Sequence, residues 1–162
     1  MGSAEAVMAD LSSLTKLSKT LNEKSNQSNK LLQDLERKLV AMNLGVEVWL
    51  MNSPLTSLIT TVSDDSDDEI TREWKHSTDE VLGFGRFGDK QALLVKTIEY
   101  DANHNGGWDI AHQGRPQLLL SASRELRVKA LEKVKLLLDE LEDEAKKIIE
   151  SIQEGKSIID KL

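Results

Sequence analysis

Apolar side chains recur through the C-terminal part of this chain at spacings that alternate between three and four residues. The positions are Leu131, Val134, Leu138, Leu141, Ala145, Ile148, Ile152, Gly155, Ile159 and Leu162. This spacing places one narrow stripe along an α-helix and is typical of helices that pair with another helix. A helix over residues 121–162, with Ser121 as its N-cap, would be roughly 63 Å long at 1.5 Å per residue. The pattern therefore predicts a long terminal helix that needs a partner of comparable length.

The N-terminal part of the chain repeats this spacing. Its positions are Ala4, Val7, Leu11, Leu14, Ser18, Leu21, Ser25, Ser28, Leu32, Leu35, Leu39 and Met42, and Gly45 follows where a helix would end. Because two helices of nearly equal length would flank the middle of the chain, we expect them to fold back as an antiparallel coiled coil. Counting outward from the middle then places Met42 beside Arg124 and Leu11 beside Gly155. The stripes could also pair between chains, and we expect a homo-oligomer.

Residues 44–120 follow a different pattern, in which apolar side chains tend to recur at every second position with polar side chains between them. The pattern predicts strands over residues 46–51, 55–62, 81–87 and 90–100, a short strand within residues 108–120, and an ambiguous one over residues 70–75. Gly88 and Asp89 have the composition of a two-residue hairpin turn. Gly83 and Gly85 alternate with Phe84 and would let a ring or a backbone approach one face closely. The acidic run at residues 63–69 is expected to be a loop.

These patterns combine into an α+β fold. We expect a helix over residues 4–43, a small antiparallel β-meander head over residues 44–120, and a helix over residues 121–162, in a single domain spanning residues 1–162. A sheet of four or five strands is not stable without cover on one face. We therefore expect the ends of the two long helices that adjoin the sheet to cover it.

The composition narrows the classes of function. The net charge is −7, which disfavours a nucleic-acid binder that neutralises phosphates. The chain has no Cys, no stretch of 18 apolar residues and no basic region followed by an apolar run. These features predict neither a membrane span nor a secretion signal, and they favour a cytoplasmic location.

Two segments carry a resemblance. They are residues 42–49, MNLGVEVW, where a long helix would enter the first strand, and residues 115–134, RPQLLLSASRELRVKALEKV, where the last helix would begin. They resemble segments of small uncharacterised bacterial and phage-type proteins with long terminal helices flanking a β-meander. The resemblance implies this architecture and a bacterial or phage source, and it implies no activity.

No motif in the sequence predicts catalysis or metal binding. The run GFGRFG at residues 83–88 lacks the strand–turn–helix context of a phosphate-binding loop. His76, His104 and His112 do not form a pair with helical metal-ligand spacing, and no G-x-S-x-G elbow occurs. We therefore expect a protein that is not an enzyme and that holds no metal or cofactor.

Aromatic and arginine side chains from the head and from the start of the last helix form the candidate binding site. They are Trp49, Phe84, Arg86, Tyr100, Trp108, Arg115, Arg124 and Arg127. Aromatics beside arginines suit either a protein partner or a planar anionic ligand. The aromatics could instead form the small core of the head. The basic start of the last helix opposes the helix dipole, so we expect a carboxylate from the facing helix, Glu36 or Asp34, or a bound anion beside it.

Three functions remain open for this candidate site. The first is a non-catalytic binding protein, of the adaptor or inhibitor kind, that recognises a partner protein through the β head. The alternative is a phage-type counter-defence protein that sequesters an anionic nucleotide second messenger without cleaving it. A third alternative is a small hydrolase.

Overall fold

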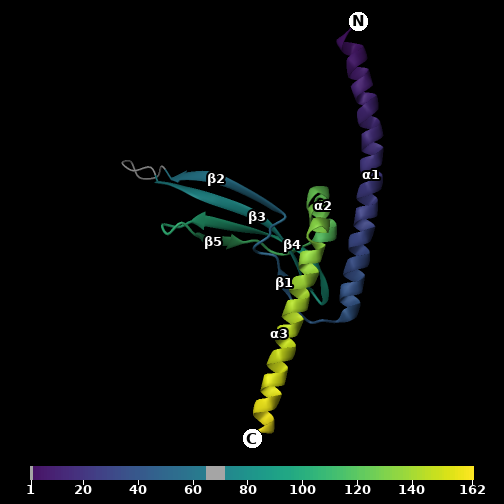
Figure 1. Ribbon diagram of the computed structural model, residues 1–162. Helices are drawn as coiled ribbons and strands as arrows, with labels where there is room; N and C mark the ends of the chain where they lie inside the picture. The colour runs from purple at the N-terminus through teal and green to yellow at the C-terminus, as the bar shows by residue number, and fades with distance from the viewer. Residues whose placement is uncertain (1, 65–71) are drawn as a thin grey trace.

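The computed structural model describes residues 2–64 and 72–162 and has an α+β fold. The helices are α1 (Ser3–Met42), α2 (Arg124–Glu132) and α3 (Val134–Asp160). The strands are β1 (Val48–Trp49), β2 (Thr56–Asp64), β3 (Arg72–Phe87), β4 (Lys90–Ala102), β5 (Trp108–Gln113) and β6 (Gln117–Leu118). They form one antiparallel sheet that projects to one side of the helices, while the two termini lie at opposite ends of the molecule (Figure 1).

The sheet confirms the predicted antiparallel meander, because strands that are neighbours in the sequence pair with each other. β2 pairs with β3, β3 with β4 and β4 with β5, while β1 and β6 add short pairings to β3 and β4. Phe87 pairs with Lys90 around Gly88, whose φ of +66° suits glycine, so the predicted hairpin turn is confirmed. β3 and β4 are longer than expected, because residues 72–80 of β3 pair with β2 and residues 76–80 also pair with β4.

The hydrophobic core lies where the helices cover one end of the sheet, as expected. We call this region the root. Its buried side chains include Leu32 and Leu39 of α1, Leu82 and Phe84 of β3, Leu93 and Val95 of β4, Leu119, Ala130 of α2, and Leu137 and Leu141 of α3. We call the rest of the sheet the blade, comprising residues 56–64, 72–80, 97–102 and 108–113. The blade extends away from the helices (Figure 1).

The two long helices do not form the predicted antiparallel coiled coil within the chain. α1, α2 and α3 all run in the same direction (Figure 1), and the Nη2 atom of Arg124 donates to Oδ1 of Asn22 at 2.8 Å. Arg124 therefore lies halfway along α1, roughly 30 Å from Met42 at 1.5 Å per residue. The sheet causes this offset, because the root occupies the C-terminal half of α1, where Glu36 accepts a hydrogen bond from the backbone N–H of Leu93 at 3.0 Å.

The C-terminal helix also differs from its prediction as one continuous element. Lys133 interrupts it with φ −102° and ψ 0°, and its Nζ atom donates to Oγ of Ser53 at 2.6 Å. The helical segment starts with Ser123, whose Oγ accepts from the N–H of Leu126 at 3.3 Å. Ser121, the expected N-cap, lies instead in a 3₁₀ turn that joins β6 to α2.

Two further sequence expectations concern the acidic run and the membrane. Ser63 and Asp64 end β2, while residues 65–69 of the predicted acidic loop lie outside the described residues. Within the described residues, no helix combines the length and the apolar character needed to cross a membrane.

Candidate functional site

The predicted site residues do not come together in one place. Trp49 lies in β1 with its ring over Gly83, so closely that a Cβ atom on Gly83 would lie 2.4 Å from the ring. The Nζ atom of Lys96 lies 4.0 Å from the Trp49 ring centroid, and Glu47 accepts a 3.0 Å hydrogen bond from Nε1. The expected approach of a ring to the glycine face of β3 is therefore confirmed. Burial lowers the pKa of Lys96, and the carboxylate of Glu47 opposes that shift.

Phe84 and Arg86 are close in sequence but lie in different environments. Phe84 is completely buried in the root, so its ring is part of the core and is closed to a ligand. Arg86 is exposed and lines an open hollow of about 510 Å³ between the end of α1 and the β3–β4 turn. Lys90 lines the same hollow, together with the carboxylates of Glu47 and Asp89, so its formal charges balance.

The other three arginines of the predicted site occupy separate positions around α2. Arg115 lines a small hollow of about 240 Å³ that also includes Glu80 and Lys96. Arg124 bonds to Asn22, and Arg127 donates to the carbonyl oxygen of Ala122.

The basic start of the C-terminal helix does not contact the expected carboxylates. Glu36 bonds to the backbone of Leu93, and Asp34 pairs with Arg37 on its own helix at 3.4 Å. The expectation of a facing carboxylate there is therefore wrong. Glu36 instead stabilises the attachment of the sheet to α1, because it satisfies a backbone donor of β4.

Tyr100 and Trp108 are the two predicted site residues that the structure brings together. They line an open hollow of about 310 Å³ on one face of the blade, which we call the blade hollow. Its other lining residues are Met51, Asn52, Ser57, Ile59, Ser77 and Asp79. Ser57 pairs with Asp79, and Ile59 with Ser77, so alternate residues of β2 and β3 point to this face. Tyr100 extends the same row, because it pairs with Ser77 from β4.

A hydrogen-bonded carboxylate forms the polar part of the blade hollow. Oδ1 of Asp79 accepts from Oγ of Ser57 at 2.6 Å and from Oγ of Ser77 at 3.0 Å. The pKa of Tyr100 is raised, first by partial burial and then by the negative charge of Asp79. The hollow therefore presents hydroxyl groups and a negative charge, which suit a donor or a cation better than an anion.

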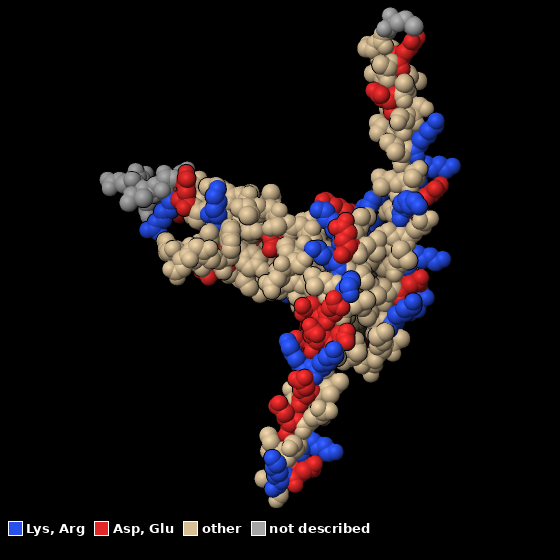
Figure 2. Space-filling model, viewed as in Figure 1, with Lys and Arg blue, Asp and Glu red and all other residues tan. Residues whose placement is uncertain are grey.

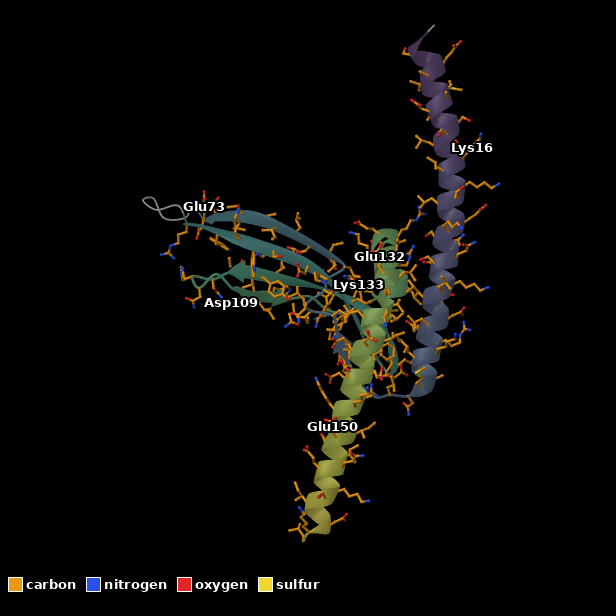
Figure 3. The ribbon with its side chains drawn as sticks, in the orientation of Figure 1. Lys16, Glu73, Asp109, Glu132, Lys133 and Glu150 are labelled. Carbon is orange, nitrogen blue, oxygen red and sulfur yellow. The ribbon has the colours of Figure 1, made fainter. Side chains whose placement is uncertain are left out.

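Apolar side chains surround this polar part and are open to solvent. Ile59 is 58% exposed, Ile110 49% and Trp108 43%. Ile110 pairs with Tyr100 across β4 and β5 and so lies on the same face. On the face of the blade that is turned to the viewer in Figure 2, few charged side chains lie between the tip and the helices. Glu73 and Asp109 lie toward the end of the blade that is farther from the helices (Figure 3).

The opposite face of the blade carries a second polar cluster, which the sequence analysis did not identify. Nδ1 of His76 lies 2.8 Å from Oδ1 of Asp101, and its Nε2 lies 3.4 Å from Oε1 of Glu99. Trp74 donates through Nε1 to Asp101 at 3.0 Å. The hydrogen bond to Asp101 is the main cause of the raised pKa of His76, and the same bond lowers the pKa of Asp101. In residues 2–64 and 72–162, no group of three or more His, Asp or Glu side chains is arranged to hold a metal ion.

The sequence contained only part of the signal for these two clusters. Period-two alternation places Ser57 and Ile59 on one face of β2, but it does not show which strand lies beside β2 or in which register.

Comparison with models of protein families, with curated proteins and with solved structures found no match for this chain.

Proposed function

We propose that this chain is a non-catalytic binding protein whose blade recognises a partner protein. One observation carries the proposal: Ile59, Trp108 and Ile110 are exposed together beside a hollow that has a satisfied carboxylate at its centre. Protein-binding hot spots are enriched in aromatic side chains beside well-formed pockets. Exposed apolar patches next to polar groups mark protein interaction sites.

The chemistry of the blade hollow indicates what the partner presents. The carboxylate of Asp79 accepts hydrogen bonds from two serine hydroxyls. A partner that inserts an apolar side chain against Trp108, with a lysine or an arginine near Asp79, would satisfy both parts of the hollow.

The edge of the blade offers a second contact for the same partner. Among the described residues, the sheet pairing of residues 56–63 of β2 is with β3 alone, so the other edge of this segment has backbone donors and acceptors outside the sheet ladder. Residues 56–63 carry no charge and no proline, and Leu58 and Ile59 are exposed. Natural proteins usually protect such an edge with charges, prolines or bulges. An unprotected edge beside an apolar patch favours a partner that adds a strand to β2.

The alternative of an anionic nucleotide ligand has less support. Arg86, Arg115 and the arginines of α2 lie in separate places, and none of the described residues that line the blade hollow is Lys or Arg. A phosphate in the blade hollow would meet the carboxylate of Asp79 without a compensating cation.

Selection of peptides from a display library against the intact protein tests the proposal. We expect the selected peptides to combine apolar and basic residues and to lose at least tenfold in affinity against Trp108→Ala and Asp79→Asn. Arg86→Ala, on the separate hollow near α1, is the matched control and should leave affinity unchanged. Peptides that bind Trp108→Ala as tightly as the unmodified protein contradict the proposal.

A panel of cyclic and ADP-ribose-type nucleotides tests the alternative. A rise in melting temperature with a nucleotide that is recovered intact after heat denaturation would favour sequestration. Conversion of the nucleotide, seen by chromatography, would favour a hydrolase. The absence of any shift across the panel leaves the protein-binding proposal as the one supported.

A further inference from the structure

Two helical segments of this chain project without cover. The α1 arm, residues 3–24, is exposed at every position. The α3 arm, residues 142–162, is exposed except at Glu144, Ala145 and Gly155, which are half-buried. Each arm continues a stripe that reaches buried residues of the root, at Leu32 and Leu39 of α1 and at Leu141 of α3.

Both arms carry apolar stripes in contact with solvent. The exposed large apolar residues of the α1 arm are Val7, Met8, Leu11, Leu14, Leu17 and Leu21. Those of the α3 arm are Ile148, Ile149, Ile152, Ile158, Ile159 and Leu162. An exposed apolar stripe of this length marks an interaction surface. Since the chain runs through the root between them, the arms point to opposite ends of the molecule, as Lys16 and Glu150 show in Figure 3.

The two stripes are complementary in size when they are placed antiparallel with Leu11 opposite Gly155. The facing pairs are then Ala4 with Leu162, Val7 with Ile159, Leu11 with Gly155, Leu14 with Ile152, Ser18 with Ile148, and Leu21 with Ala145. Every small residue on one stripe faces a large residue on the other. In the seven-residue repeat abcdefg, the apolar stripe occupies positions a and d. In this register each a residue of one helix faces a d residue of the other, as knobs-into-holes packing of antiparallel helices requires.

The fold of a single chain is compatible with this register when a twofold axis passes at the level of Leu32. Asn22 lies beside Arg124 and the helices run parallel, so Leu32 lies roughly level with Val134, ten residues further along each helix. A twofold axis at this level, perpendicular to the helices, would relate the two copies. It would place the α3 arm of one copy at the same height along the helix direction as the α1 arm of the other copy. Gly155, 21 residues beyond Val134, then reaches the height of Leu11, 21 residues before Leu32.

From the size complementarity of the two exposed stripes we propose that two copies of the chain form a twofold dimer in which each α1 arm packs antiparallel against the α3 arm of the other copy. The arms have nearly equal lengths, roughly 33 Å and 32 Å at 1.5 Å per residue, so each covers the other. In a dimer, the two reciprocal contacts between arms cover all four apolar stripes and leave no stripe for a further copy. Head-to-tail stacking would leave free ends and continue as a filament. The dimer does not depend on what the blade binds.

Light scattering on the intact protein gives the first test. We expect twice the chain mass of 18.1 kDa. A mass of one chain, or a mass that grows with concentration beyond two chains, would overturn the proposal.

Engineered cysteines test the register, since the chain has none of its own. Val7→Cys and Ile159→Cys, made in separate chains and mixed, should form a disulfide-linked heterodimer on mild oxidation. Neither variant alone should cross-link, because the two copies of each residue lie at opposite ends of the dimer. Head-to-tail stacking, with Leu162 of one copy against the start of the next α2, would instead bring Val7 near Ile148. Preferential cross-linking of Val7→Cys with Ile148→Cys would therefore exclude the antiparallel register.

Charge substitutions separate dimer formation from folding. Leu14→Asp and Ile152→Asp should each convert the dimer to a particle of one chain mass. The circular dichroism signal of the sheet should remain, because both residues lie on arms outside the root. Ser13→Asp, on the same arm but off the stripe, is the control and should keep the mass of two chains. Retention of the dimer by both Leu14→Asp and Ile152→Asp would overturn the proposal.

Discussion

The root and the blade are two ends of the same β3–β4 ribbon, and they differ in what covers them. In the root, residues 81–85 and 92–95 are buried on both faces, because helices cover one face and side chains such as Trp49 over Gly83 and Glu47 over Gly85 cover part of the other. In the blade, the same two strands carry His76, Asp79 and Asp101, whose partners are other side chains of the sheet. Burial is therefore concentrated at one end of the ribbon, and the other end exposes more of its side chains to solvent.

The largest difference between the two regions should appear on removing an aromatic ring. Phe84→Ala empties a completely buried site in the root and should lower the free energy of unfolding by about 3–5 kcal/mol. Trp108→Ala removes a ring from the exposed face of the blade and should cost less than about 1 kcal/mol. Urea unfolding monitored by circular dichroism measures both. Equal losses would show that the blade contributes to stability as much as the root does.

A matched pair of glycines on β3 sharpens the comparison within the root itself. A methyl group at Gly83 would meet the Trp49 ring, which Lys96 and Glu47 hold in place, so Gly83→Ala should cost about 1–3 kcal/mol. At Gly85 the methyl group would meet the side chain of Glu47, which can turn into solvent, so Gly85→Ala should cost less.

A double-mutant cycle with Trp49→Ala identifies the source of the effect at Gly83. If the ring causes the loss, Gly83→Ala should cost little in the Trp49→Ala background. An unchanged cost in that background would assign the effect to the backbone of β3 instead.

The smallest effect should come from the blade and should depend on pH. The raised pKa of His76 means that its protonated form is held more strongly in the folded state. Its contribution is therefore fully present below its ordinary pKa of 6.5 and is lost as the pH rises through the raised value. The lowered pKa of Asp101 has the opposite sign, so its contribution is lost only as the pH falls from its ordinary value of 3.8 through the lowered one.

The contributions of His76 and Asp101 to the stability of the folded state are both present between pH values of about 4 and 6.5. The melting temperature of the unmodified protein should therefore exceed that of His76→Gln by more at pH 5.5 than at pH 8.5. In an Asp101→Asn background this pH-dependent difference should become smaller. A difference that grows toward pH 8.5 would contradict the assignment.

The sequence patterns predicted most of the helices and strands, but they did not predict how these elements pack together. The spacings of three and four located both long helices, and Gly88 with Asp89 located the central hairpin, because both signals come from neighbouring residues. The direction of α2 along α1 depends on where the sheet returns the chain, and no local pattern records that. The blade hollow was half predicted, since Tyr100 and Trp108 were candidates while Asp79 was not. A carboxylate on a strand becomes notable only when β2 brings Ser57 beside it in a specific register.

The parallel docking of α1 against α2 has a consequence for how the protein is made. Each major pairing in the sheet joins strands that are close in sequence, whereas Arg124 and Asn22 are separated by 102 positions. Contacts between distant residues form late, because a long loop must close before they contribute. During synthesis α1 therefore leaves the ribosome before Ala130, Leu137 and Leu141, the buried residues of α2 and α3, have been made. Until α2 and α3 follow, the apolar stripe of α1 lacks these partners, so we expect the nascent chain to be accessible to chaperones during that interval.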